Sequence, residues 1–236
     1  MRNAVHLLEL LGEGAAYQQL TDLAERSGMS IPTVHRLLRS LVLADLVVQD
    51  PRSSRYGLGP ELARLSHHYL SRLPLLGALS PYLAQLRDQL DHTIHVQILV
   101  HGEVVYVDRV DGAERGPYRE AHRVVPALAC AGGRLLAARS DDEGWERALA
   151  RLEPDGAADV SATDRAHWQE VGHLAFTPED PTLPSEVAVP VIDGQGVTVA
   201  ALAANIDDPA DEREVRLVAG QLARAARAAG RTLGHA

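Results

Sequence analysis

Apolar and polar side chains follow helical spacing in three separate stretches of residues 1–41. The apolar sets are Val5, Leu8 and Leu11, then Leu20, Leu23 and Ala24, then Val34, Leu37, Leu38 and Leu41. The second stretch ends at Gly28, and glycine commonly follows the last residue of a helix. The pattern therefore predicts three short helices on a small core, with a tight turn between the second and the third.

The third stretch carries its own start signals and a polar outer face. Ser30 stands where a side chain can cap the helix, and Pro32 falls in the first turn, where its missing N–H costs nothing. With the apolar stripe buried, the outward face consists of Thr33, His35, Arg36, Arg39 and Ser40. A helix that follows a short turn and presents such donors is typical of a DNA recognition helix, since arginine can pair bidentately with guanine.

The periodicity changes from helix to strand after this stretch. Residues 47–49 and 55–58 indicate two short strands, and residues 50–54 a turn between them. A hairpin in this place forms a wing, on which Arg52 and Arg55 could reach phosphate or the minor groove. The alternative is a winged helix used for protein contacts, with the helix arginines simply solvated.

Beyond residue 59 the pattern mixes helices and strands. Helical periodicity covers residues 60–73 and returns in an amphipathic helix at the end of the chain, over residues 211–233. Two β-hairpins are predicted between them, one turning at residues 101–103 and one at residues 193–196. Strands flanked by helices make an α/β domain, here of about 160 residues.

The distribution of charge changes the meaning of the acidic total. The 236 residues carry a net charge of −9, yet residues 1–72 hold eight Arg against seven acids, and residues 26–55 hold five Arg against two. A local basic face near the N-terminus is therefore compatible with an acidic chain. No apolar run approaches the roughly 20 residues of a spanning helix, and the N-terminus lacks the apolar region of a signal peptide. We expect a cytoplasmic protein with no membrane partner.

The residue types that carry chemistry form no catalytic or metal-binding pattern. Cys130 is the one cysteine, and its small apolar neighbours indicate a buried thiol. His92 and His95 lie in a β-rich run, where a spacing of three places them on opposite sides, and the adjacent His67 and His68 point apart on a helix. We expect no metal, no cofactor and no enzymatic activity. An enzyme or sensor housed in the C-terminal portion is the rival class.

Four segments together resemble the IclR family of bacterial transcriptional regulators, in the family's order along the chain. They are "LAERSGMSIPTVHRLLRSL" (23–41), "GEVVYVDRVDG" (102–112), "PALACAGGRLLAA" (126–138) and "VAVPVIDGQGVTVAALAANI" (187–206). The resemblance implies a winged helix-turn-helix over 1–58, a linker helix over 59–74, and a GAF-like α/β domain for effector binding and oligomerisation over 75–236. It implies double-stranded operator DNA, a small-molecule effector, and a homodimer or dimer of dimers as partners.

Under this reading the expected function is sequence-specific transcriptional regulation, as a repressor, under the control of a small metabolite. The alternative is a sensor or adaptor that uses the winged helix for protein contacts. The candidate DNA-binding residues are Ser30, Pro32, Thr33, His35, Arg36, Arg39, Arg52 and Arg55. One recognition helix reads few bases, so we expect a symmetric dimer. The candidate dimer contacts are the helix over 60–73 and the N-terminal helix with Leu7, Leu8 and Leu11.

The resemblance also implies an effector pocket, in which this chain departs from the family. Matching residue by residue, the candidate effector-binding residues are Val125, Cys130, Ala131, Phe176, Thr177, Ala203 and Asn205. Phe176 and Thr177 stand where the family commonly has Asp-Asp, and Leu128 stands where it has His. The family's Ser-x-Ser becomes Ala203-Ala204-Asn205, which keeps one polar side chain on that face.

Few polar anchors and an apolar wall favour a ligand held by burial. We expect an organic acid or aromatic metabolite, larger and more apolar than a two- or three-carbon oxoacid, oriented by Asn205. The alternative is that these side chains only fill the core.

Overall fold

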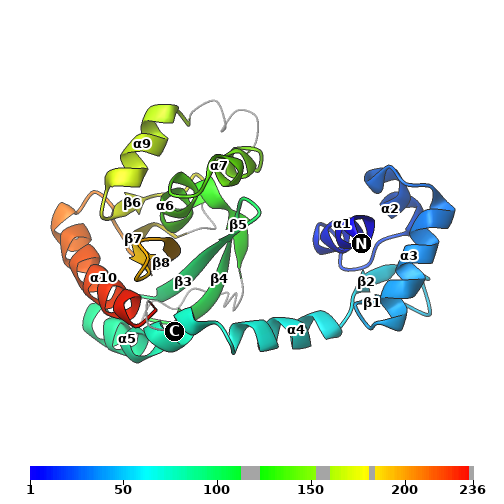
Figure 1. The fold of residues 1–236 in the computed structure, drawn as a ribbon, viewed down its shortest axis with the longest axis horizontal. Helices are drawn as coiled ribbons and strands as arrows, with labels where there is room; N and C mark the ends of the chain where they lie inside the picture. The colour runs from blue at the N-terminus through cyan, green and yellow to red at the C-terminus, as the bar shows by residue number, and fades with distance from the viewer. Residues whose placement is uncertain (113–122, 153–159, 181–183, 234–236) are drawn as a thin grey trace. The chain divides into compact units, whose positions relative to one another are not determined.

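The computed structural model describes residues 1–112, 123–152, 160–180 and 184–233. The chain divides into two compact units, Met1–Arg72 and Leu73–Ala236, and each is described by itself. The first unit combines helices with a two-stranded hairpin, and the second is built on a six-stranded sheet (Figure 1). The predicted fold class, a winged helix-turn-helix followed by an α/β domain, is confirmed.

The N-terminal unit follows the predicted order of helices and strands. It contains α1 (Arg2–Gly12), α2 (Leu20–Ser27), α3 (Ile31–Leu43), β1 (Val47–Gln49), β2 (Tyr56–Leu58) and α4 (Glu61–Leu70). As predicted, α2 ends at Gly28, whose φ of 65° lies in the left-handed region that glycine adopts without a steric penalty. The wing strands are antiparallel. An isolated β-bridge joins Gln18 to Tyr56 of β2, which ties the wing to the segment after α1.

The core of this unit lies where the apolar stripes of the three helices meet. Its buried residues are Leu7, Leu10, Leu11, Leu23, Ala24, Val34, Leu38, Leu41, Val47 and Tyr56. The predicted core position Val5 is wrong, because the buried stripe of α1 is centred on Leu7, Leu10 and Leu11 and leaves Val5 50% exposed. The prediction that Leu7 and Leu11 contact a second chain is also wrong, because both are buried in the core.

Helix α4 differs from the three helices before it. None of its residues, all of which the structure describes, is buried within the chain. Leu65 and Tyr69, one helical turn apart, are 45% and 56% exposed. An apolar stripe without cover in its own chain indicates a surface that packs against something else.

The C-terminal unit carries the six-stranded sheet. Its elements are α5 (Pro74–Leu90), β3 (Ile94–Val100), β4 (Glu103–Val110), β5 (Val124–Pro126), η1 (Ala127–Ala129), α6 (Ala131–Ala138), α7 (Asp142–Leu149), α9 (Ala162–Glu170), β6 (Leu174–Phe176), β7 (Glu186–Ile192), β8 (Thr198–Asn205) and α10 (Glu212–Leu233). The strand order is β5-β4-β3-β8-β7-β6, and neighbouring strands are antiparallel. Both predicted hairpins are confirmed, and the first turns through His101 and Gly102, which both have positive φ.

Helices cover the two faces of the sheet in different ways. α5 and α10 pack together on one face, and α6 lies on the other face, across β7, β8 and β3 (Figure 1). Successive residues of a strand point to opposite faces, so β3 alternates between the two helical layers. His95 and Gln97 point to the α6 face, whereas Ile94 and Val96 point to the other.

The first turn of α6 approaches its neighbours unusually closely. A Cβ on Gly133 would lie 1.9 Å from the Ala127 carbonyl oxygen and 2.7 Å from Val104 Cγ2. These atoms belong to backbone and to a fully buried side chain, which cannot move aside cheaply. The close approach of α6 to the sheet therefore depends on glycine at this position.

We expect Gly133→Ala to lower the free energy of unfolding by about 1–3 kcal/mol or more, as overpacking of a core does. Gly220→Ala is the matched control, because Gly220 is an exposed glycine within α10 with no atom within 4 Å of the added Cβ. That change should stabilise the protein by up to about 1 kcal/mol through helix propensity. Chemical denaturation of both variants measures the difference. Equal effects of the two alanines would contradict the close packing described here.

Candidate nucleic-acid interface and ligand site

The outward face of α3 presents the predicted polar residues. His35, Arg36, Arg39 and Ser40 are exposed and Thr33 is partly exposed, while Val34, Leu38 and Leu41 hold the opposite side in the core. Ser30 occupies the N-cap position, but its hydroxyl bonds to the Thr33 hydroxyl at 2.9 Å instead of to a backbone N–H, which corrects its predicted capping role. Pro32 lies in the first turn as predicted.

The wing turn is organised by an aspartate, which leaves its arginines exposed. The Asp50 carboxylate accepts hydrogen bonds from the backbone N–H groups of Arg52 and Ser53, at 3.3 and 2.9 Å, and from the Ser53 hydroxyl. The Ser53 hydroxyl and these backbone groups lower the pKa of Asp50. Arg52 and Arg55 are exposed on this turn. A fixed turn with two exposed guanidinium groups suits contacts to phosphate.

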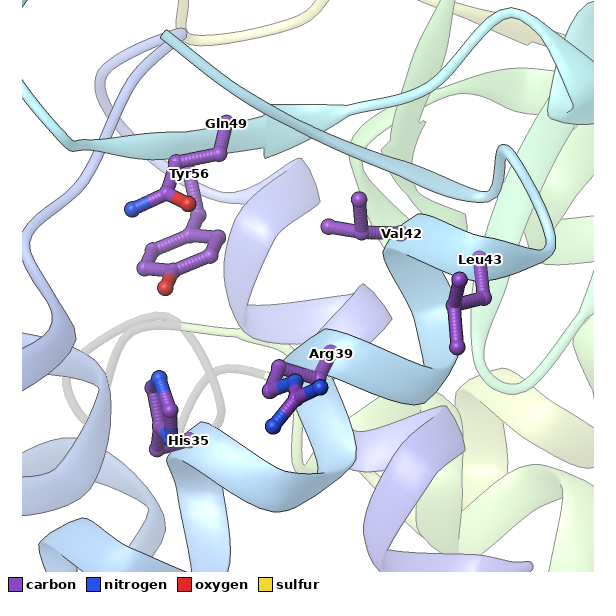
Figure 2. Close-up of a pocket in the computed structure, with 6 residues that line it drawn as sticks. All are labelled: His35, Arg39, Val42, Leu43, Gln49 and Tyr56. Atoms are coloured by element: carbon purple, nitrogen blue, oxygen red, sulfur yellow. The ribbon is translucent and has the colours of Figure 1, made fainter. Parts of the chain in front are cut away.

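A groove of about 440 Å³ lies between α3 and the wing (Figure 2). It is lined by His35, Arg39, Val42, Leu43, Gln49 and Tyr56. The His35 ring, the Arg39 guanidinium and the Tyr56 hydroxyl turn toward the same space in Figure 2. Gln49 and Tyr56 were predicted as strand residues but not as residues of this groove. Their only sequence signal is the strand alternation, which cannot tell that β1 and β2 return beside α3.

Arg26 has a structural role, although it counted toward the predicted basic segment. Its guanidinium donates to the Gln18 side-chain oxygen at 2.7 Å, to the Leu10 carbonyl at 3.3 Å and to the Glu13 carboxylate at 2.9 Å. These bonds tie α2 to the end of α1. Of the five arginines in residues 26–55, the four available to a polyanion are therefore those of α3 and the wing.

Most of the predicted effector residues lie on the α6 face of the sheet. Ala131 and Ala203 are fully buried there, with Phe176 packed against them, and Val125 and Cys130 are buried in the adjoining cluster. Thr177 stays apart, since it is exposed and accepts a hydrogen bond from the Ser185 hydroxyl at 3.2 Å.

The α6 face also carries four buried polar residues that were not among the predicted site residues: His95, Gln97, Tyr106 and Glu186. Strand register brings them together with Asn205. Phe176, Glu186 and Asn205 form one row across β6, β7 and β8, and Ala188, Ala203 and His95 form the next. Pro190, Ala201, Gln97 and Tyr106 form a third row.

Glu186 lies at the N-terminal end of α6. Its Oε1 accepts from the Gly132 N–H at 3.0 Å, and its Oε2 accepts from the Gln97 amide Nε2 at 3.0 Å. Burial raises the pKa of Glu186, while the Gly132 and Ala131 N–H groups, the Gln97 amide and the Cys130 thiol oppose that rise. The two hydrogen bonds at a helix N-terminus favour the anion, but burial is the larger effect and the pKa stays above its ordinary value.

Two buried acceptor atoms in this cluster have no partner within the described residues: His95 Nδ1 and Gln97 Oε1. His95 Nε2 lies 2.7 Å from the Asn205 amide oxygen, so this ring nitrogen carries the proton and Nδ1 is left as an acceptor. Burial lowers the pKa of His95 to about 4, so the ring is neutral at neutral pH. Tyr106 packs edge-on against it, with ring centroids 5.1 Å apart.

Cys130 is buried, as predicted, and caps α6. Its sulfur accepts from the Gly133 N–H at 3.4 Å, and burial raises the pKa of the thiol. A protonated, enclosed thiol is a poor nucleophile. His92 Nε2 lies 3.2 Å from the Glu214 carboxylate. No group of three or more potential metal ligands occurs among the described residues, and none of the helices in that part of the chain could span a membrane.

Comparison with protein families gives two matches. Residues 2–51 match the IclR helix-turn-helix domain, and residues 67–171 match the C-terminal domain of the bacterial transcriptional regulator IclR. The HTH-type transcriptional regulator XynR of Escherichia coli is 26% identical over 244 residues, which cover 100% of this chain and 97% of XynR. The HTH-type transcriptional regulator Rv1719 of Mycobacterium tuberculosis is 30% identical over 233 residues, covering 93% and 87%.

Solved structures share the fold over nearly the whole chain. An IclR family regulator from Brucella abortus has a TM-score of 0.79 at 21% identity and is matched over 97% of this chain and 89% of its own. An IclR homolog from Microbacterium hydrocarbonoxydans, complexed with 4-hydroxybenzoate, has a TM-score of 0.64 at 22% identity, with 98% and 97% covered.

The buried neutral state of His95 makes stability depend on pH. Its pKa is lowered on folding, from 6.5 to about 4. The contribution is therefore present above pH 6.5 and is lost as the pH falls, because the unfolded state takes up the proton first. Between pH 7 and pH 5 this difference amounts to about 2 kcal/mol. We expect His95→Gln to lose correspondingly less stability than the unmodified protein over that interval in urea denaturation.

The exposed His173→Gln serves as the control, because it removes a histidine outside the cluster. It should keep the pH dependence of the parent protein. Indistinguishable pH dependence of His95→Gln and the parent would mean that His95 is not held neutral by burial.

Proposed function

The chain belongs to the IclR family of bacterial transcriptional regulators, and we propose that it docks its operator with the outward face of α3 under the control of a small molecule bound beneath α6. The observation that carries the proposal is the exposed row of donors on α3, backed by a fully apolar inner side. The protein acts in the cytoplasm and without catalysis. It acts as a repressor, because a protein seated in the major groove at a promoter obstructs transcription. This mode and location follow from the target and remain part of the proposal.

The roles of the individual side chains follow from where they lie on α3 and the wing. His35 and Arg36 meet base edges in the major groove, since they lie in the N-terminal half of α3, the part of a recognition helix that enters the groove. Arg39 lies one turn further along the same exposed face and extends these contacts. Thr33, together with Ser30 and Pro32 at the start of α3, approaches the phosphates. Arg52 and Arg55 contact phosphate or the minor groove from the wing. Gln49, on the groove between them, is a further candidate contact.

The effector site is the α6 face of the sheet. Val125, Cys130, Ala131 and Ala203 supply apolar walls, and Phe176 closes one edge. The Arg134 guanidinium lies 3.6 Å from the centre of the Phe176 ring, which holds that ring in place. An apolar lining favours an aromatic metabolite, the class to which the ligand of the Microbacterium homolog belongs. Asn205 orients the ligand through its bond to His95, and Thr177 lies at the rim.

Assembly of two chains follows from the α4 surface. Leu65 and Tyr69 form an exposed apolar stripe, and Val5 is an exposed apolar residue of α1. We propose that α4 pairs with α4 of a second copy, as a homodimer or within a dimer of dimers. Two recognition helices then read paired half-sites, which one helix cannot do.

Arginine substitutions test the DNA contacts. Arg36→Ala should lower operator affinity by roughly 1–3 kcal/mol and relax specificity at one base pair, because a base contact is lost. Arg52→Ala should weaken binding to all sequences about equally and reduce the salt slope by about 1, because a phosphate contact is lost. Fluorescence anisotropy on duplexes selected from a random pool measures both effects.

Arg224→Ala, an exposed arginine of α10, is the charge-matched control and should leave DNA affinity unchanged. If Arg36→Ala bound the selected duplexes as tightly as the parent protein, the docking by α3 would be wrong. Failure of the parent protein to select any duplex would favour an adaptor that uses its winged helix for protein contacts.

A charge placed on the α4 stripe tests assembly. Leu65→Glu should convert the dimer to a monomer in light scattering, since burying a carboxylate in an apolar interface is costly. His67→Glu, on the opposite side of the same helix, should leave the dimer intact. A parent protein that is monomeric at micromolar concentration and still binds its operator tightly would refute the proposed pairing.

A further inference from the structure

We infer that Glu186 takes the place of a ligand carboxylate at the start of α6, so that the effector of this protein is an uncharged hydroxyl-bearing molecule and not an acid. The inference rests on the proposed function, because it names the ligand class of the same site. It rests on three observations: the position of Glu186, the two unpartnered acceptors beside it, and the apolar remainder of the walls.

The position of Glu186 settles what the helix terminus can bind. The free N–H groups of a first helical turn attract an anion, and here Gly132 N–H already donates to Glu186 Oε1 at 3.0 Å. Glu186 is 1% exposed and comes from the same chain, so it occupies this place at an effectively constant high concentration. A carboxylate ligand would have to displace Glu186 or lie beside it and compete for the same N–H donors.

The unpartnered atoms define what the site still lacks. Gln97 Nε2 donates to Glu186, which turns the Gln97 oxygen toward the first turn of α6, where a Cβ on Gly132 would lie 1.8 Å from it. That oxygen and His95 Nδ1 are acceptors without donors among the described residues. Gln97 is fully buried and His95 is 3% exposed, so neither atom is satisfied by bulk water.

A ligand suited to this site must supply donors to two acceptors. Hydroxyl groups do so without adding charge, whereas a carboxylate supplies only further acceptors at neutral pH. The surrounding small and apolar residues, Ala131, Ala188 and Ala203, leave the rest of the ligand to be held by burial. A phenol or aromatic alcohol meets both requirements.

The first arm of the test compares matched probes on the full-length protein by calorimetry. The pairs are 4-hydroxybenzyl alcohol with 4-hydroxybenzoate, and benzyl alcohol with benzoate. We expect each alcohol to bind at least tenfold more tightly than its acid. Equal affinities, tighter binding of the acids, or binding of no probe would each overturn the inference.

The second arm changes Glu186. Glu186→Ala vacates the helix terminus, so 4-hydroxybenzoate should gain at least tenfold in affinity while the alcohol changes little. Glu186→Gln replaces the carboxyl group with an amide of the same size, and it is the variant to measure if the alanine variant does not fold. It should reduce the ratio of alcohol affinity to acid affinity. An unchanged ratio in every folded variant would leave Glu186 a purely structural residue and refute the assignment.

A DNA readout separates this inference from the proposed function. Alcohol binding that leaves operator affinity unchanged would uphold the ligand class and defeat effector control. Acids that bind and alter operator affinity would uphold effector control and defeat the role of Glu186.

Discussion

The close contact between the first turn of α6 and the sheet determines most of what the C-terminal unit can do. Gly132 and Gly133 let the helix backbone approach so closely that a single Cβ at either position would collide with Gln97 or Ala127. The approach brings the Gly132 N–H within 3.0 Å of Glu186 and encloses the polar cluster. A helix seated even slightly higher would admit water, and the pairing of Glu186, Gln97, His95 and Asn205 would lose its energetic value.

The same contact explains why polar residues lie in a core that is otherwise apolar. Glu186 is acceptable in the interior because its oxygens meet a backbone N–H and an amide, and His95 is acceptable because it stays neutral and donates to Asn205. Gln97 and His95 are each paired on one side only, because Gln97 Oε1 and His95 Nδ1 have no partner among the described residues. Such partly satisfied networks are costly for stability, which is why we connect them with ligand binding.

The winged helix was largely predictable, because its determinants are local. The spacing of Val34, Leu38 and Leu41, the left-handed Gly28 and the wing turn at Asp50 all act within a few residues of themselves. The error at Val5 concerned which side of α1 faces the core. Several sides of this helix are apolar, and only packing decides which of them is buried. The exposed donors of α3 could be named from sequence because they are what the buried stripe leaves over.

The α6 face of the sheet was predictable only in part, because its polar residues come from strands that are far apart in sequence. Gln97 and Glu186 are 89 residues apart and meet only through the register of β3, β8 and β7. A signal was present in retrospect: Gln97 stands between apolar residues of β3, Glu186 begins the otherwise apolar β7, and such polar residues need a partner when buried. The partner itself cannot be identified until the strand order is known.

In the proposed function, the ligand binds on one face of the sheet. That face carries α6, whereas α5, which begins at Pro74 just after the boundary between the units, packs on the opposite face. β3 joins the two layers, since His95 and Gln97 point to α6 while Ile94 and Val96 point the other way, next to the bulge between Val96 and Gln97. A ligand changes DNA affinity only if it binds one arrangement of this strand better than another. Hydrogen bonds from the ligand to His95 and Gln97 would provide this difference in affinity directly, because both side chains belong to β3 and point toward α6.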